Sequence, residues 1–150
     1  MLVRRALLIG AFTFAAFAAN LSGTWKLNVA KSKYVGIPTP KETTVTYTTQ
    51  GQGWKYEAKG ISGEGQPTNL SFVYEKDGVD ATVTGFPYAD TIALKDGNGD
   101  NSMATFKRGG KAVGTVKRTV SKDGKTITLD GKLTLADGKK ATYIAVYEKQ

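Results

Sequence analysis

The chain has 150 residues, a net charge of +8, no Cys and no His. Without these two residue types, disulfides, Cys nucleophiles, Ser-His-Asp triads and His or thiolate metal sites are excluded. The 13 acidic residues fall at turns or on the polar faces of the expected strands. We therefore identify no catalytic, metal or cofactor site and expect a non-enzymatic protein. The basic residues stand singly or in pairs rather than in a block, and a nucleic-acid partner is not expected.

The first 18 residues have the pattern of an export signal. Two arginines are followed by an apolar run over residues 6–17 and by Ala16-Phe17-Ala18, the order typical of a signal peptide with its cleavage site. We expect cleavage after residue 18, or alternatively after Ala19, and one domain over residues 19–150 in the periplasm or outside the cell, without stable membrane insertion. An uncleaved anchor is the rival interpretation, which the shortness of the apolar run disfavours because a spanning helix needs about 20 apolar residues.

Beyond this segment, short alternating runs are separated by glycine-rich turns, with no helical periodicity. Asp123-Gly124, Asp137-Gly138 and Gly109-Gly110 are typical hairpin turns. The pattern predicts an all-β, antiparallel, up-and-down barrel of eight to ten strands, whose closure removes exposed sheet edges. The expected strands cover residues 23–29, 41–49, 54–61, 68–75, 79–84, 91–95, 102–107, 111–121, 126–129 and 140–148, and residues 132–135 extend the ninth or form a further strand.

Apolar and polar residues alternate within the expected strands, which gives each strand one apolar face. Trp54 and Tyr56 share one face, for example, and Lys55 and Glu57 share the other. A soluble barrel turns the apolar face inward. The rival, an outer-membrane barrel, reverses this arrangement; short strands and a chain that ends in Glu-Lys-Gln disfavour it.

Both ends of the domain carry sequences that resemble the calycin superfamily of lipocalins and fatty-acid-binding proteins. These are Gly23-Thr24-Trp25-Lys26-Leu27 on the first strand and Tyr143 to Lys149 on the last. The resemblance implies a structural role for Gly23 and Trp25 at the closed floor of the barrel, with Trp25 packed against a basic residue from a late strand. Gly-Thr-Trp-Lys-Leu-Asn, together with Ala-Lys-Ser-Lys, is also similar to a family of small, exported, lipocalin-like bacterial proteins.

The segment over residues 31–40 departs from the fatty-acid-binding proteins, which insert two helices at this place. Pro38 and Pro40 forbid a regular helix here. We expect a loop across the barrel mouth instead. The departure favours a lipocalin-like barrel over one with a helical portal.

Arg118 is the most informative polar residue, because Val116 and Val120 place it on the apolar face of its strand. An inward Arg must be paired, hydrated or bound to a ligand. The sequence leaves two roles open: a ligand anchor, or a structural Arg that stacks on Trp25 or pairs with a carboxylate. A bulge at Gly114 would turn the side chain outward.

Tyr147 is the second expected polar anchor. Fatty-acid-binding proteins carry Arg-x-Tyr on the last strand, and this chain has Ala145-Val146-Tyr147, which retains only the Tyr. The walls of the expected cavity are aromatic. The remaining candidate ligand contacts are Tyr143, Tyr56, Phe72, Tyr74, Phe106 and Trp54, all on expected inner faces.

Three functions remain open from the sequence, and an enzyme that uses carboxylate, Lys, Tyr or Ser chemistry is the least favoured of them. The first is a carrier or sequestering protein for a small hydrophobic or amphipathic molecule held inside the barrel. The second is a protein-interaction or inhibitor module with a filled barrel, which would act through the loops at residues 34–40 and 86–88. We expect a monomer in either case. A cavity of about 300 Å³ or more would favour the carrier.

Overall fold

The computed structural model describes residues 21–150, so the expected signal peptide lies outside the described residues. Within these residues, eleven strands and one short 3-10 helix, η1, follow one another. They are β1 (Gly23–Leu27), η1 (Val29–Lys31), β2 (Lys33–Val35), β3 (Glu42–Gln50), β4 (Gly53–Ile61), β5 (Pro67–Tyr74), β6 (Ala81–Thr82), β7 (Thr91–Lys95), β8 (Asn101–Arg108), β9 (Lys111–Val120), β10 (Thr126–Thr134) and β11 (Lys140–Lys149).

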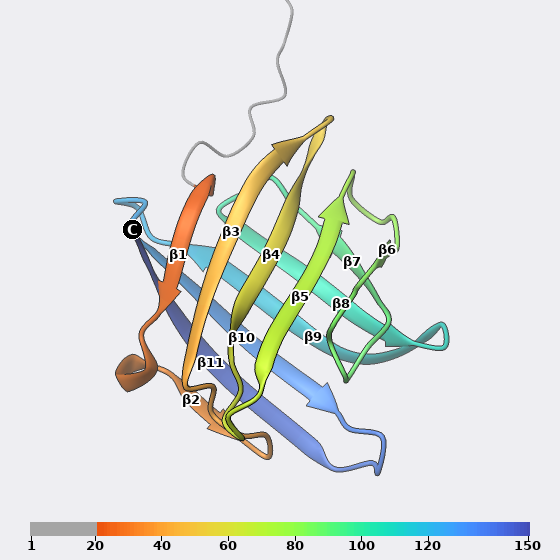
Figure 1. Cartoon of the computed structure of the whole chain (residues 1–150). Coiled ribbons are helices and arrows are strands. Elements are labelled where there is room, and N and C mark those ends of the chain that lie inside the picture. The colour runs from red at the N-terminus through yellow and green to blue at the C-terminus, as the bar shows by residue number, and fades with distance from the viewer. Residues whose placement is uncertain (1–20) are drawn as a thin grey trace, which may run out of the picture.

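Ten of these strands form one antiparallel barrel, in the order β5-β4-β3-β1-β11-β10-β9-β8-β7-β6, and β2 pairs with β11. Figure 1 shows β1, β3, β4 and β5 as one layer, crossed steeply by the layer of β7 to β11 behind it. The barrel is nearly closed, because β5 meets the segment after β6 only through the bridge of Ser71 with Thr84. The sequence predicts eight to ten strands, and the barrel has ten.

Two expected segments differ from the observed ones. The expected strand at residues 79–84 is reduced to β6, because apart from the Ser71–Thr84 bridge nothing pairs with its β5 side. Residues 31–40, expected as a loop, contain β2, which pairs with β11 opposite Thr142 to Ile144. The absence of a regular helix between β2 and β3 agrees with the two prolines there.

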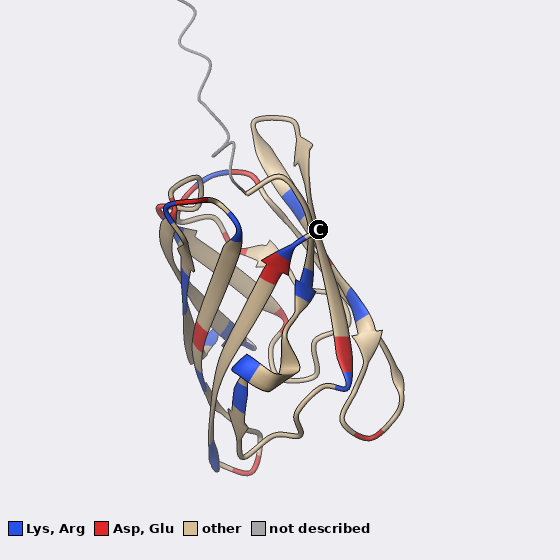
Figure 2. Ribbon diagram, turned by 90° about the vertical axis from the view of Figure 1, so that its left-hand side faces the viewer, with Lys and Arg blue, Asp and Glu red and all other residues tan. Residues whose placement is uncertain are grey.

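On β11 the alternation of side chains predicts the two faces correctly. Ala145 and Tyr147 are buried, whereas Ile144 is 44% exposed. Lysines, arginines and carboxylates are interspersed over the strands and turns without a block of one sign (Figure 2). Within residues 21–150, no helix is long and apolar enough to cross a membrane.

Candidate functional site

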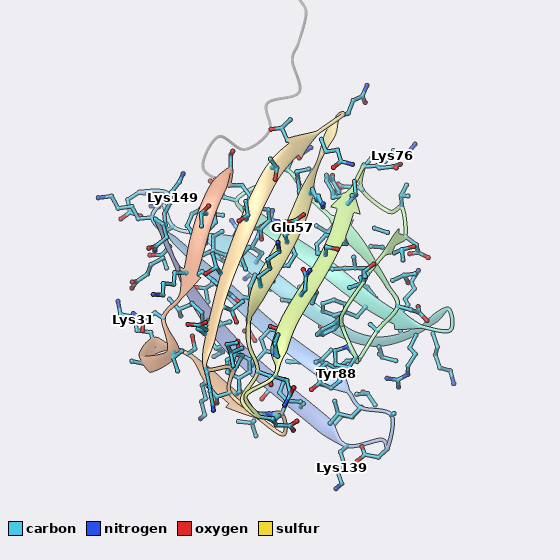
Figure 3. All side chains as sticks on the ribbon, viewed as in Figure 1. Lys31, Glu57, Lys76, Tyr88, Lys139 and Lys149 are labelled. Atoms are coloured by element: carbon cyan, nitrogen blue, oxygen red, sulfur yellow. The ribbon has the colours of Figure 1, made fainter. Side chains whose placement is uncertain are left out.

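The barrel encloses a cavity of about 390 Å³. It extends from a closed end beside the β7–β8 loop to a mouth at the opposite end of the barrel, formed by the segments around Pro38, Gly63 and Tyr88. Figure 3 shows Tyr88 at the mouth end and Lys76 at the opposite, closed end. A volume above 300 Å³ is in the range of small-molecule sites.

The barrel floor is built on Trp25, which is fully buried and does not line the cavity. Its indole nitrogen donates a hydrogen bond to the Leu21 carbonyl at 3.0 Å. The Lys149 ammonium lies 5.4 Å from the ring centroid, which is the contact with a late basic residue that the calycin resemblance implies. Gly23 has a φ of +120°, a conformation that a side chain would strain.

Arg118 points into the barrel, and only 4% of it is exposed. The register shift on β8 and β9 lies between Phe106 and Lys107, so the bulge considered for Gly114 does not turn Arg118 outward. Its Nη2 donates to the carbonyls of Gly97 and Gly99, both at 2.9 Å. These bonds tie β9 to the β7–β8 loop and close this end of the barrel.

The same loop is held from its other side by Asp77. The Asp77 carboxylate accepts hydrogen bonds from the Tyr74 hydroxyl at 2.7 Å and from the backbone N–H groups of Asp96 and Gly97, both at 2.9 Å. The Tyr74 hydroxyl and these N–H groups lower the pKa of Asp77. Gly97 must lack a side chain, because a Cβ there would lie 2.5 Å from the Tyr74 ring.

Two buried donors at the closed end have no hydrogen-bond partner among the described residues: Arg118 Nε and Trp54 Nε1. The Arg118 guanidinium carbon lies 5.4 Å from the Trp54 ring centroid and 6.0 Å from that of Tyr47. None of the ion pairs formed by residues 21–150 includes Arg118. The guanidinium therefore lies against aromatic rings and donates to carbonyls, but no carboxylate within residues 21–150 neutralises its charge. The sequence analysis considered Trp25 or a carboxylate as a structural partner, and neither of them stacks on or pairs with Arg118 here.

One side of the cavity carries phenol hydroxyls. We call this side the tyrosine wall; it consists of Tyr34 on β2, Tyr56 on β4, and Tyr143 and Tyr147 on β11. Within the described residues, none of the four hydroxyls is hydrogen-bonded, and none is sealed from the cavity space. Burial raises the pKa of Tyr34 to about 12, and burial together with the neighbouring phenols raises those of the other three.

The position of Tyr143 depends on a glycine in the neighbouring strand. Gly131 on β10 is its register partner, and a Cβ on Gly131 would lie 2.1 Å from Cζ of Tyr143. The ring therefore lies directly over the glycine backbone. On its other side, Tyr143 stacks on Tyr34 with the ring centroids 5.7 Å apart. Gly131 thus creates the space in which the phenol is held.

The other side of the cavity consists of hydrocarbon. We call it the hydrocarbon wall. Its side chains come from β5 and from β7 to β10 and are Leu70, Phe72, Ile92, Leu94, Ala104, Phe106, Val116, Leu129 and Leu133. On these strands, the polar lining side chains that lie deep in the barrel are Arg118 and its register partner Ser102.

Most of the expected ligand contacts meet in this cavity. Those that line it are Arg118, Tyr147, Tyr143, Tyr56, Phe72, Phe106 and Trp54. Tyr74 is a correction: it faces inward, but it packs at the closed end outside the cavity, and Asp77 occupies its hydroxyl. The sequence reasoning missed Tyr34 and Ser102. Among residues 21–150, no cluster of three or more His, Cys, Asp or Glu residues could hold a metal ion.

Comparisons with known proteins show the fold. A scan against protein-family models finds no match, and a search of curated proteins finds none either. The crystal structure of zebrafish ileal bile acid-binding protein complexed with cholic acid matches with a TM-score of 0.52 and 11% identity, over 88% of this chain and 100% of that one. The chain therefore shares the β-barrel fold of that structure. At this identity the likeness shows architecture alone.

Proposed function

We propose that this protein carries or sequesters a small amphipathic, acidic molecule inside the barrel. The observation that carries the proposal is a buried, positively charged Arg118 that lines a 390 Å³ cavity and keeps an unpartnered Nε donor. The likeness of the fold to a bile acid-binding protein supports it.

The physical argument is the cost of burying an unneutralised charge. Aromatic rings and carbonyls stabilise the guanidinium only in part, and a buried donor without a partner costs about 1–3 kcal/mol. A ligand carboxylate at the closed end would neutralise the charge and accept from Arg118 Nε, while its hydrocarbon part packs along Phe72 and Phe106. A filled barrel that acts only through its loops would leave the cavity and the free donor without a purpose.

The wider proposal keeps the expectations from the sequence. Residues 1–18 are a signal peptide, and residues 19–150 are a monomeric, lipocalin-like domain in the periplasm or outside the cell. The protein is a non-enzymatic member of the small exported bacterial proteins that its first strand resembles. The ligand anchors are Arg118 and Tyr147, and the other cavity-lining aromatics contact the hydrocarbon part.

A competition assay tests this proposal: it measures how well stearic acid displaces a fluorescent anionic dye from the mature domain. Arg118→Met should weaken stearate binding by about 30-fold or more, the usual effect of truncating one partner of a buried charge pair. Lys117→Met is the matched control, because it removes a charge from the exposed face of the same strand. Equal binding by wild type and Arg118→Met, with both folded, would contradict the proposal. If Arg118→Met does not fold, Arg118→Lys retains the charge but not the geometry and replaces it.

Native mass spectrometry of the protein from its producing cells gives an independent test. A small acidic molecule that is released on unfolding would identify the ligand class directly. A protein that neither co-purifies with a ligand nor binds stearate would point to the loop-based alternative.

A further inference from the structure

We propose that the ligand carries polar oxygens along one face of its hydrocarbon body, in addition to any acidic head group, and that this face lies on the tyrosine wall. The inference rests on the proposed function and specifies its ligand class: a facially amphipathic molecule rather than a simple fatty acid.

The first argument is the sorting of side chains around the barrel. The members of the tyrosine wall come from β4, from β11 and from β2, which pairs with β11. In the strand order β4 and β11 are separated only by β3, which adds Tyr47 to the cavity lining, and by β1. The hydrocarbon wall occupies the remaining arc, from β10 through β9, β8 and β7 and across the narrow gap to β5. A ligand in the cavity therefore meets hydroxyls on one side and hydrocarbon on the other. A chain whose only polar group is its head would match one of these sides and not the other.

The second argument is the number of hydroxyls that open into the cavity. Tyr56 is 9% exposed and Tyr147 is 6% exposed, and neither hydroxyl forms a hydrogen bond within residues 21–150, although both residues line the cavity. A ligand that fills the cavity displaces water from these hydroxyls, and each one left without a bond weakens the complex. The hydroxyls of Tyr34 and Tyr143 continue this row toward the mouth, since both residues line the cavity and their rings stack.

The third argument concerns the chemistry that suits these groups. Burial raises the pKa of Tyr56 and Tyr147 well above the ordinary value, so both phenols stay neutral and each can donate and accept one bond. Neutral hydroxyls pair well with hydroxyl or carbonyl oxygens. The acidic group belongs at the closed end, where Arg118 and Trp54 offer free N–H donors.

The test compares two acids with the same skeleton and the same carboxylate. Cholic acid carries three hydroxyls on one face of the steroid, and 5β-cholanic acid carries none. We expect the mature domain to bind cholic acid at least 10-fold more tightly, because each hydrogen bond to a buried group that the analogue cannot make contributes about 2- to 12-fold. Stearic acid is the third probe, and displacement of the same fluorescent dye is the readout.

Variants assign the preference to the tyrosine wall. Tyr56→Phe with Tyr147→Phe should weaken cholic acid binding more than cholanic acid binding and so reduce the cholic-to-cholanic affinity ratio to about 3 or less, since only the two oxygens are removed. Thr142→Val is the matched control; it removes an exposed hydroxyl from the outer face of β11 beside Tyr143. This control should keep the wild-type ratio.

The outcomes separate the two proposals. Cholanic or stearic acid binding as tightly as cholic acid would overturn the facial preference and leave the proposed carrier function standing. A wild-type preference that the Tyr-to-Phe variant retains would also overturn it, because the tyrosine wall would then not be the cause. If none of the three acids binds, both proposals fail.

Discussion

Arg118 and Asp77 are joined through one residue, Gly97. The Gly97 N–H donates to Asp77 Oδ1, and the Gly97 carbonyl accepts from Arg118 Nη2, both at 2.9 Å. The exposed carboxylate thus supports the loop that orients the buried guanidinium, without touching it. Removing either side chain should loosen the same loop, but only Arg118 faces the cavity.

The stability of the closed end should depend on acid. The Tyr74 hydroxyl and the Gly97 N–H lower the pKa of Asp77 in the folded protein, so the stabilisation is present above the unfolded pKa, about 3.9, and is lost as the pH falls through the lower, folded value. Asp77→Asn should lower the free energy of unfolding by roughly 1 kcal/mol at pH 6, with solvent screening allowed for, and change it little at pH 2.

Urea unfolding of wild type and Asp77→Asn at these two pH values measures the effect. Glu75→Gln is the control, because it removes a neighbouring exposed carboxylate that makes no hydrogen bond to the loop. An equal loss of stability in Asp77→Asn at both pH values would show that the charge of Asp77 does not stabilise the loop.

The two tryptophans should differ in their effect on ligand binding when each is replaced by Phe. Trp25→Phe removes the bond to the Leu21 carbonyl and leaves a space in the floor, which should cost about 1–3 kcal/mol of stability without a change in ligand affinity. Trp54→Phe also leaves a space, because Trp54 is 1% exposed, but it removes in addition an unpartnered N–H at the proposed acid-binding end. This variant should therefore bind stearate about 3- to 10-fold more weakly. Guanidinium unfolding measures the stability of the two variants and dye displacement measures their affinity, and an equal affinity in both variants would contradict the expected difference.

The alternation of inward and outward side chains along each strand explains why most of the expected cavity residues could be predicted from the sequence. Along β9 the two-residue period places Arg118 with Val116 and Val120, and all three are buried. The same period placed Tyr74 in the cavity wall, whereas it lies outside the cavity. The period predicts which face of the strand a residue occupies but not its height along the barrel axis. That height depends on register and sheet coiling, which bring Tyr74 beside Gly97 at the closed end.

Tyr34 and Ser102 were not recognisable for a different reason. β2 has three residues, and it forms because β1 ends at Leu27 and leaves the edge of β11 free from Thr142 to Ile144. Pairing with a distant strand, rather than local propensity, determines such a short element. Ser102 lies beside Arg118 only through the register of β8 with β9. The alternating pattern and the calycin resemblance both predicted the barrel, but neither contains information about the positions of Tyr34 and Ser102.

Replacing Gly131 should displace Tyr143. An Ala Cβ at this position would lie 2.1 Å from the ring, so the phenol must move, and we expect a loss of about 1–3 kcal/mol in the free energy of unfolding. In a Tyr143→Ala background the three atoms nearest to this Cβ are absent, so the same substitution should cost clearly less. A double-mutant cycle by urea unfolding gives the coupling between the two residues; additive effects would mean that the ring does not depend on Gly131.

The mouth should control how fast a ligand leaves. A Cβ on Gly63 would lie 2.6 Å from Cβ of Pro38 and 2.6 Å from the Thr39 carbonyl oxygen, so Gly63→Ala should push the β2–β3 linker away from the β4–β5 turn. We expect dissociation of bound dye to accelerate several-fold while the association rate changes less, as is usual for local changes at a binding site. Gly65→Ala is the control: its φ of +86° strains the same turn, but the added Cβ meets only the end of the Lys41 side chain, at 3.6 Å. Stopped-flow dilution measures both rates. An equal acceleration in the two variants would mean that strain in the turn, rather than displacement of the linker, opens the mouth.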